Sequence, residues 1–211
     1  MGVIASDFDL PITIVQTSMV APLGFAVGHA LEVRESLECL RGGGPSDLRE
    51  LVTLEGGELL RLVGMAGDLK EGRAKIGAAL DDGSALGAFR AGVVAQGGDP
   101  ELVDDPSQLP TAPDQTDLVA EAAGYLSFAD CAAVGRAVGA LGGGRMRLED
   151  PIDHAVGVVF NKRLGDQVAK DEPICVIHHR AGAGLEEARA QLTLALRLTA
   201  EPEVEPLVLD A

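Results

Sequence analysis

The sequence of 211 residues has no tryptophan, and aromatic side chains make up only 3% of it. Proteins that bind single-stranded nucleic acid stack bases on aromatic rings, so the composition disfavours that class. Basic residues are scarce as well, since 17 Lys and Arg stand against 33 Asp and Glu for a formal net charge of −16. Nucleic acids and anionic membranes are bound through clustered Lys and Arg, so we expect neither as a partner.

Cysteine is also rare, with Cys39, Cys131 and Cys175 far apart in the chain. An odd number of cysteines without CxxC spacing predicts neither a disulfide framework nor a zinc site. Reduced thiols are typical of cytosolic proteins. No apolar run reaches the length of a membrane span, and the first residues carry no basic region of a secretory signal. The sequence therefore predicts a soluble, cytoplasmic protein.

Hydrophobic periodicity predicts a helical first part and a mixed second part. The first part has an expected strand at 12–17 and helices at about 22–40, 45–62, 70–80 and 84–96. Four prolines make residues 99–115 the best linker. The second part has expected strands at 116–120, 124–130, 155–161 and 173–179 and helices at 132–141 and 185–199. The predicted division is 1–98, a linker at 99–115, a domain at 116–200 and a tail at 201–211.

Three smaller features have structural interpretations. Gly24 and Gly28, four residues apart, suggest close approach by another backbone. His178 and His179 fall on a predicted strand, where neighbours point to opposite faces, so one half-buried and one exposed histidine are expected rather than a metal pair. Residues 164–174 resemble the hairpin of biotinyl and lipoyl carrier domains. They lack the Met-Lys-Met or Asp-Lys-Ala motif, and a carrier role would require a covalently modified lysine.

A longer resemblance begins at Pro22. Residues 22–35 read PLGFAVGHALEVRE and closely resemble the PLGxAVGNALEVxE segment of thymidine and pyrimidine-nucleoside phosphorylases. The resemblance covers nearly the whole chain from about Ile12, in the family's order. Further matching segments are Leu40–Leu51, Ala95–Pro100, Val103–Pro110, Leu141–Arg145, Ile152–Gly157 and Leu164–Val168. The chain departs from the family at Ser18 and Ala21, where an acidic and an amide residue are usual, and at His29, which replaces Asn.

This resemblance implies an α/β and α+β fold: a partial glycosyl-transferase-type α/β lobe, mostly helical, followed by a C-terminal α/β hammerhead-like (barrel-sandwich) domain. It implies reversible phosphorolysis, in which phosphate attacks the anomeric carbon of a pyrimidine nucleoside and releases the base and a (deoxy)ribose 1-phosphate. The family's phosphate- and base-binding groups lie in a preceding half without a match here, so no catalytic residue is assigned. Phosphate and nucleoside are expected as partners only after completion by that half. The alternative is a non-catalytic remnant or interaction module of the same fold.

The family's bacterial pyrimidine-nucleoside branch resembles a monovalent-cation binder. By resemblance, Leu23 and Ala26 supply main-chain carbonyls and Glu35 a carboxylate to K⁺, and the other ligands would lie in the missing half. The alternative for Glu35 is a solvated helix carboxylate. No organic cofactor is expected, and the resemblance implies a homodimer.

Overall fold

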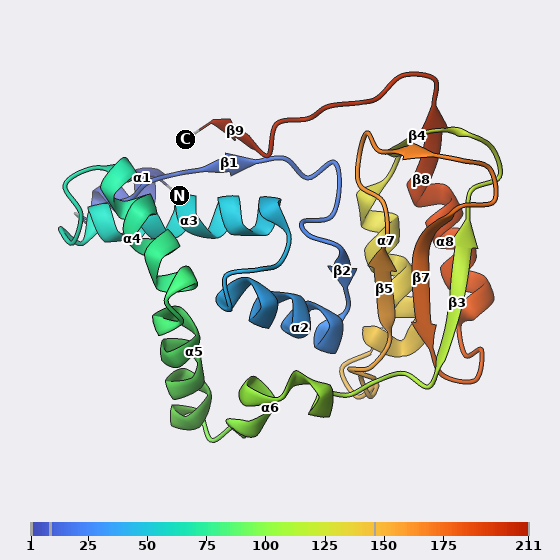
Figure 1. The fold of residues 1–211 in the computed structure, drawn as a ribbon, viewed down its shortest axis with the longest axis horizontal. Helices are drawn as coiled ribbons and strands as arrows, with labels where there is room; N and C mark the ends of the chain where they lie inside the picture. Colours follow the sequence, from blue (N-terminus) through green and yellow to red (C-terminus); the bar gives the residue numbers. More distant parts are fainter. Residues whose placement is uncertain (1, 9, 146, 211) are drawn as a thin grey trace. The chain divides into compact units, whose positions relative to one another are not determined.

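The computed structural model describes residues 2–8, 10–145 and 147–210, and Figure 1 traces their helices and strands. Helices and strands are both present, which confirms the predicted mixed fold class. The chain forms two compact units. Unit 1 comprises residues 1–18, 37–100 and 206–211, and unit 2 comprises residues 19–36 and 101–205. Each unit therefore contains segments distant in sequence, unlike the continuous ranges of the sequence-based division.

Unit 1 is mostly helical. It contains α1 (Gly2–Asp7), the end of α2 (His29–Leu40), α3 (Ser46–Leu62), α4 (Leu69–Asp81) and α5 (Ser84–Ala95). The Asp68 carboxylate caps α4 by accepting a hydrogen bond of 2.8 Å from the Glu71 N–H, as N-cap aspartates do. Between α4 and α5, Gly83 adopts φ +80°, a conformation that glycine tolerates at low cost. The helices predicted at 45–62, 70–80 and 84–96 are confirmed to within a few residues.

Helices α3 and α4 approach each other through glycines. A Cβ on Gly57 would lie 2.7 Å from the Arg73 backbone nitrogen, and one on Gly72 would lie 2.8 Å from the Gly57 Cα. Both glycines are buried. Side chains at these two positions would push the helices apart. Glycine at both positions therefore allows α3 and α4 to cross this closely.

The strand predicted at 12–17 is much shorter in the structure. Only Gln16–Thr17 (β1) form a ladder, and they pair antiparallel with Val208–Asp210 (β9) of the C-terminal tail. Sequence periodicity did not predict β9. Residues 10–15 make no ladder bonds with any described residue, and their trace runs along α3 in Figure 1.

Unit 2 contains two antiparallel sheets (Figure 1). The four-stranded sheet has the order β2 (Ala26–Val27), β5 (Gly157–Phe160), β7 (Pro173–His179) and β3 (Asp114–Val119). The three-stranded sheet has the order β6 (Gln167–Val168), β4 (Gly124–Phe128) and β8 (Leu196–Thr199). The helices are α6 (Glu101–Asp104), α7 (Cys131–Val138), which continues as a π turn to Gly143, and α8 (Leu185–Ala195); a 3₁₀ turn spans Pro106–Gln108.

The core of unit 2 contains alanine, valine and leucine with few aromatic rings, as the composition predicts. The largest fully buried side chains include Leu126, Val134, Val156, Val158, Ile177 and Leu192. Phe128 and Phe160 meet edge to face with ring centroids 5.5 Å apart, a favoured aromatic geometry. This core holds α7 and α8 against the strands.

Two predicted helix boundaries were wrong. The helix expected at 185–199 ends at Ala195, and Leu196–Thr199 pair with β4 instead. The helix expected from Pro22 begins at His29, because Ala26–Val27 pair with β5 first. For both helices a strand pairing overrides a helical local pattern. The segment 99–115 contains α6 and a 3₁₀ turn and leads into β3.

The three cysteines are free thiols, with Cys39 and Cys175 buried. Burial raises the pKa of Cys175 to about 12, and the nearby Asp117 carboxylate adds to the shift. Such a thiol stays protonated and unreactive near neutral pH. Among the described residues, no helix has the length and apolar character needed to cross a bilayer.

Candidate functional site

The segment 22–35 folds as a loop, the short strand β2 and the first turns of α2, and the Glu35 carboxylate joins these parts. Glu35 Oε1 accepts hydrogen bonds from the backbone N–H groups of Phe25 (2.8 Å) and Ala26 (3.2 Å). Hydrogen bonds to a charged acceptor are roughly twice as strong as neutral ones. Glu35 therefore fastens the loop to the helix that begins only three residues after Ala26.

Glycines make room for this arrangement. Gly24 adopts φ +70°, and the Glu35 carboxylate occupies the space that a Cβ on it would need. Gly28 adopts φ +142°, and its Cβ would lie 2.7 Å from the Val156 carbonyl oxygen. The predicted close approach by another backbone is confirmed at Gly28, whereas at Gly24 the neighbour is a side chain. The Gly28 N–H also donates to Glu32 Oε1 at 2.9 Å.

The loop is held on the four-stranded sheet through Phe25. Its carbonyl accepts a hydrogen bond of 2.8 Å from the Phe160 N–H at the end of β5. On the other side, the Arg163 guanidinium lies 4.6 Å from the centroid of the Phe25 ring. This is within the range of a cation–π interaction. The position of Glu35 relative to β5 is thus fixed from the loop side.

Histidine contacts bring together segments that are far apart in sequence. His29 Nε2 lies 2.8 Å from the Gly143 carbonyl oxygen, and the rings of His29 and His154 meet edge to face with centroids 4.8 Å apart. The His154 carbonyl accepts from the Ala30 N–H at 3.0 Å. The phosphorylase-like segments at 22–35, 141–145 and 152–157 therefore meet within unit 2.

Beside His154, the Asp153 carboxylate pairs with Arg180 at 2.9 Å. The hydrogen bond from Arg180 is the main reason that the pKa of Asp153 is lowered. The Arg180 guanidinium therefore forms an ion pair with a carboxylate of its own unit.

The three residues predicted to hold K⁺ lie in one loop-and-helix arrangement. Glu35 is half-buried and bonded to the loop, so its alternative interpretation as a solvated helix carboxylate is wrong. Carboxylate and carbonyl oxygens are the donors that hard cations prefer. Glu35 Oε1 receives the N–H groups of Phe25 and Ala26 in this structure, and the K⁺ site formed with the Leu23 and Ala26 carbonyls stays a prediction. The described residues contain no group of three or more His, Cys, Asp or Glu suited to a metal ion.

Arg34 has a positioning role that sequence reasoning missed. Its guanidinium donates to the carbonyls of Leu109 (2.7 Å), Pro110 (3.1 Å) and Pro106 (3.3 Å). Three carbonyls around one guanidinium satisfy much of its donor capacity. Part of the predicted linker is thereby fixed onto α2. The neighbouring prolines, which prevent a regular helix or strand and leave carbonyls exposed, were the signal in the sequence.

The His178-His179 pair does not form a metal site. His179 is buried, and its Nε2 lies 2.9 Å from the Thr116 hydroxyl, while its Nδ1 accepts from the Gly182 N–H at 3.1 Å. His178 is half-buried, so the expected exposed member of the pair was predicted wrongly. Within the described part of the chain, His178 Nδ1 is buried without a hydrogen-bond partner.

His178 should remain neutral to lower pH than an ordinary histidine. Burial lowers its pKa, and the nearby Arg34 and His179 side chains lower it further. Because the unfolded chain then binds this proton more readily, the stability that His178 contributes is lost as pH falls below about 6.5. We expect His178→Asn to make the free energy of unfolding less pH-dependent between pH 7 and 5. Urea titrations across that range measure it, and an unchanged slope would contradict the assignment.

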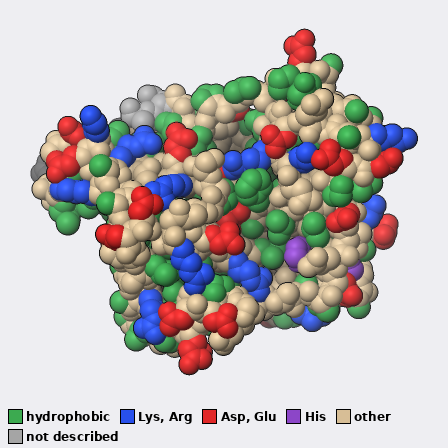
Figure 2. Space-filling model, viewed as in Figure 1, with side chains coloured by type: hydrophobic (Ala, Val, Ile, Leu, Met, Phe, Trp, Pro, Cys, Tyr) green, Lys and Arg blue, Asp and Glu red, His purple; other side chains and the backbone are tan. Residues whose placement is uncertain are grey.

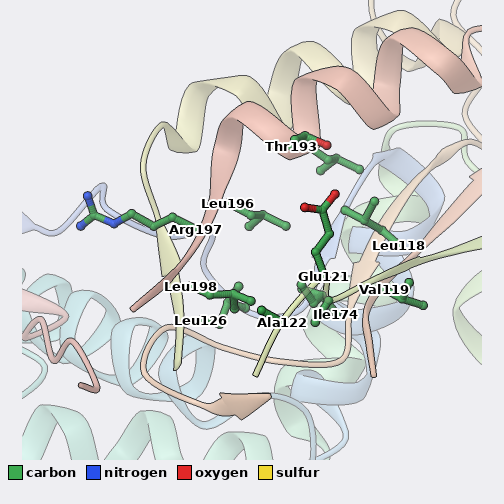
Figure 3. Close-up of a pocket in the computed structure, with 12 residues that line it drawn as sticks. Leu118, Val119, Glu121, Ala122, Leu126, Ile174, Thr193, Leu196, Arg197 and Leu198 are labelled. Atoms are coloured by element: carbon green, nitrogen blue, oxygen red, sulfur yellow. The ribbon is translucent and has the colours of Figure 1, made fainter. Parts of the chain in front are cut away.

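A pocket of about 270 Å³ opens between the two sheets of unit 2. It is lined mainly by apolar side chains of β3, β8 and α8, including Leu118, Leu192, Leu196 and Leu198. Figure 3 shows the Glu121 carboxylate pointing toward Thr193. Arg197 lies at the same pocket, but its guanidinium is bonded to Glu203 at 2.8 Å. A phosphate site needs cationic groups. This pocket instead carries the Glu121 carboxylate, and its Arg197 guanidinium is already bonded to Glu203.

Comparisons with known proteins identify two family domains in this chain. The family described as "Glycosyl transferase family, a/b domain" matches residues 10–86, and the "Pyrimidine nucleoside phosphorylase C-terminal domain" matches residues 125–199. The pyrimidine-nucleoside phosphorylase of Bacillus subtilis (strain 168) is 40% identical over 192 residues, which are 91% of this chain and 44% of the relative.

Two further relatives are also pyrimidine-nucleoside phosphorylases. The pyrimidine-nucleoside phosphorylase of Geobacillus stearothermophilus is 39% identical over 193 residues, covering 92% of this chain and 44% of the relative. The pyrimidine-nucleoside phosphorylase of Staphylococcus aureus (strain bovine RF122 / ET3-1) is 41% identical over 162 residues, covering 77% of this chain and 37% of the relative. This chain thus spans less than half the length of these relatives. It belongs to the pyrimidine-nucleoside phosphorylase family.

Proposed function

We propose that this chain supplies the C-terminal part of a pyrimidine-nucleoside phosphorylase and acts in reversible phosphorolysis only when the rest of the enzyme completes it. The observation that carries the proposal is the identity of 40% to the Bacillus subtilis enzyme across 91% of this chain. Phosphate would attack the anomeric carbon of a pyrimidine nucleoside, the glycosidic bond would break, and the base would leave with the bonding electrons. The products are the base and a pentose 1-phosphate.

This chemistry needs cationic and hydroxyl groups at the phosphate and at the departing base anion. In unit 2 the guanidinium groups of the site are used structurally: Arg34 bonds three carbonyls, and Arg180 pairs with Asp153. The contribution that we assign to this chain is a rigid frame, in which Glu35 and Gly28 hold the loop 22–28 in place. The charged groups that touch substrate would come from the remaining part of the enzyme.

Two measurements test these roles, a structural frame from this chain and substrate-binding charges from the rest of the enzyme. Titration of the purified chain with phosphate, and separately with uracil and thymine, should give no saturable binding. Phosphate-dependent release of base from uridine or thymidine should appear only in an assembly with the part of the enzyme that this chain does not match. If the folded assembly is inactive, the chain is instead a non-catalytic interaction module of the same fold.

We also propose that K⁺ binds at the loop through the Leu23 and Ala26 carbonyls and the Glu35 carboxylate. The Glu35 carboxylate is bonded to the loop that carries Leu23 and Ala26, and the hard oxygen donors of the three residues support the proposal. When bound, the ion would lock the loop against the rest of the enzyme. In the assembly, replacing 100 mM K⁺ by tetramethylammonium should lower the melting temperature, and Glu35→Gln should abolish that difference. An equal melting temperature in both salts would overturn the cation site.

The same proposal places the enzyme in the cytoplasm as a homodimer that binds no nucleic acid. The three cysteines are free thiols, which are typical of proteins in a reducing compartment. Cell fractionation and light scattering of the assembly test the compartment and the oligomeric state.

A further inference from the structure

The pocket of unit 2 lies at the side where each of its two sheets ends in an edge strand. Strand β3 is at the end of the four-stranded sheet, and β8 is at the end of the three-stranded sheet. These strands, the turn after β3 and α8 supply most of the lining, as Figure 3 shows. All lining residues lie between 118 and 198, so the walls of the pocket come from one unit.

The lining is mostly apolar. Leu126 and Leu192 are fully buried, Ile174 is 5% exposed, and Leu196 and Leu198 are half-buried. A dry cavity of about 150 Å³ lined by such side chains holds one benzene ring. The pocket measures about 270 Å³, which gives room for two fused rings. Apolar rings that enter it leave water, and their burial favours binding.

Among the described residues that line the pocket, Glu121 carries the one carboxylate. In Figure 3 its side chain extends between Leu118 and Leu196, with the carboxylate directed toward Thr193. Glu121 has neither a hydrogen-bond partner nor an ion-pair partner in the described part of the chain. Its negative charge is therefore available to a ligand in the pocket.

Arg197, the one basic residue of the described lining, is already bonded within unit 2. Its guanidinium donates to both carboxylate oxygens of Glu203, at 2.8 and 3.1 Å, and to the Ser127 hydroxyl at 3.1 Å. In Figure 3 the Arg197 side chain extends away from the apolar lining. An anionic ligand would thus meet a carboxylate without an available cation, whereas a cationic ligand would gain a charge-assisted hydrogen bond.

We propose that this pocket binds a small apolar amine, whose rings lie among the leucines and whose ammonium group donates to the Glu121 carboxylate. No lining residue belongs to the loop 22–28 or to α2, so the inference does not depend on the proposed function. The purified full chain is sufficient for the test, because unit 2 supplies every wall of the pocket.

The experiment titrates the chain with two ligands that share an indole ring and differ in charge, tryptamine and indole-3-propionate. Tryptamine should bind saturably, with a dissociation constant of about 1 mM or below for a ligand of this size. Amide NMR signals of the lining residues Ala122, Thr193 and Leu198 should shift on binding. Tryptamine should bind about fivefold more tightly than indole-3-propionate, because a charge pair at an exposed carboxylate changes affinity by a small factor.

Glu121→Gln removes the charge and keeps the shape of the side chain. In this variant the affinities for tryptamine and indole-3-propionate should differ by less than about twofold, since the remaining contacts are apolar. The matched control is Glu149→Gln, an exposed carboxylate of unit 2 outside the lining, which should keep the fivefold preference. Both glutamates are exposed, so both variants should melt like the wild-type chain.

The control also separates Glu121 from the overall charge of the chain. The formal net charge is −16, and Figure 2 shows acidic side chains spread among basic ones over the viewed face. Loss of the preference in both variants alike would mean that this general field attracts the amine, which would overturn the inference.

A second variant tests the pocket itself. Ala122 lines the pocket and is exposed, so Ala122→Trp should fill part of it without unfolding the chain and should abolish binding of both ligands. The inference is overturned if tryptamine does not shift the lining amides or if indole-3-propionate binds as tightly as tryptamine. It is also overturned if the preference survives Glu121→Gln, or if Ala122→Trp binds like the wild-type chain.

Discussion

Gly72→Ala should destabilise unit 1 by about 3 kcal/mol, near the upper end of the usual cost of overpacking. The added methyl would lie 2.8 Å from the Gly57 Cα, which is backbone and cannot rotate away. Helices α3 and α4 would have to separate, and the packing beside the crossing, where Ile76 lies against Gly56, would be lost with it. Chemical denaturation followed by circular dichroism measures the change.

The control is Gly87→Ala on α5 of the same unit. A Cβ on Gly87 meets no described atom within 4 Å, so this change should stabilise the helix by about 0.5–1 kcal/mol through its better helix propensity. Two Gly→Ala changes in neighbouring helices would then have opposite signs. Equal effects from the two would show that α3 and α4 do not cross at Gly57 and Gly72.

Glu35→Ala should lower the stability of unit 2 by about 2–3 kcal/mol. The substitution removes the acceptor of the Phe25 and Ala26 N–H groups in a partly buried site, and an unsatisfied buried donor costs about 1–3 kcal/mol. Glu35→Gln keeps a neutral acceptor and should cost about half as much. Thermal and urea unfolding of the chain alone provide the measurement.

Glu38→Ala, one turn further along α2, is the matched control. Glu38 is exposed, and surface changes of this kind stay within about 0.5 kcal/mol. If Glu35→Ala costs no more than Glu38→Ala, the carboxylate does not hold the loop, and the frame that we assign to this segment loses its main contact.

The helices of unit 1 were predictable because a residue typical of a helix start precedes each of α3, α4 and α5. Pro45 before α3, Asp68 before α4 and Gly83 before α5 mark starts that depend on local backbone chemistry. The strand β7 was predicted at its full length, since its run of apolar and β-branched residues is a local strand signal. Local sequence patterns mispredict a segment whose secondary structure depends on pairing with a strand that is distant in the chain. Leu196–Thr199 fit the helical period, yet they pair with β4, which lies about seventy residues earlier in the chain.

The site shows the same limit. The sequence could place Leu23, Ala26 and Glu35 in one segment by resemblance, and the spacing of Gly24 and Gly28 signalled close packing. It could not show that Glu35 accepts from two N–H groups of the loop, because that depends on the loop turning back over α2. The contacts of His29 with Gly143 and His154 are equally remote in sequence, at separations of more than 110 residues.

The most direct test of the account is phosphate-dependent release of uracil from uridine, or of thymine from thymidine. Three samples are compared: this chain alone, the unmatched part of the Bacillus subtilis enzyme alone, and the two assembled. The account predicts release by the assembly and none by either part. Release by this chain alone, or no release from a folded assembly that contains both parts, would contradict it.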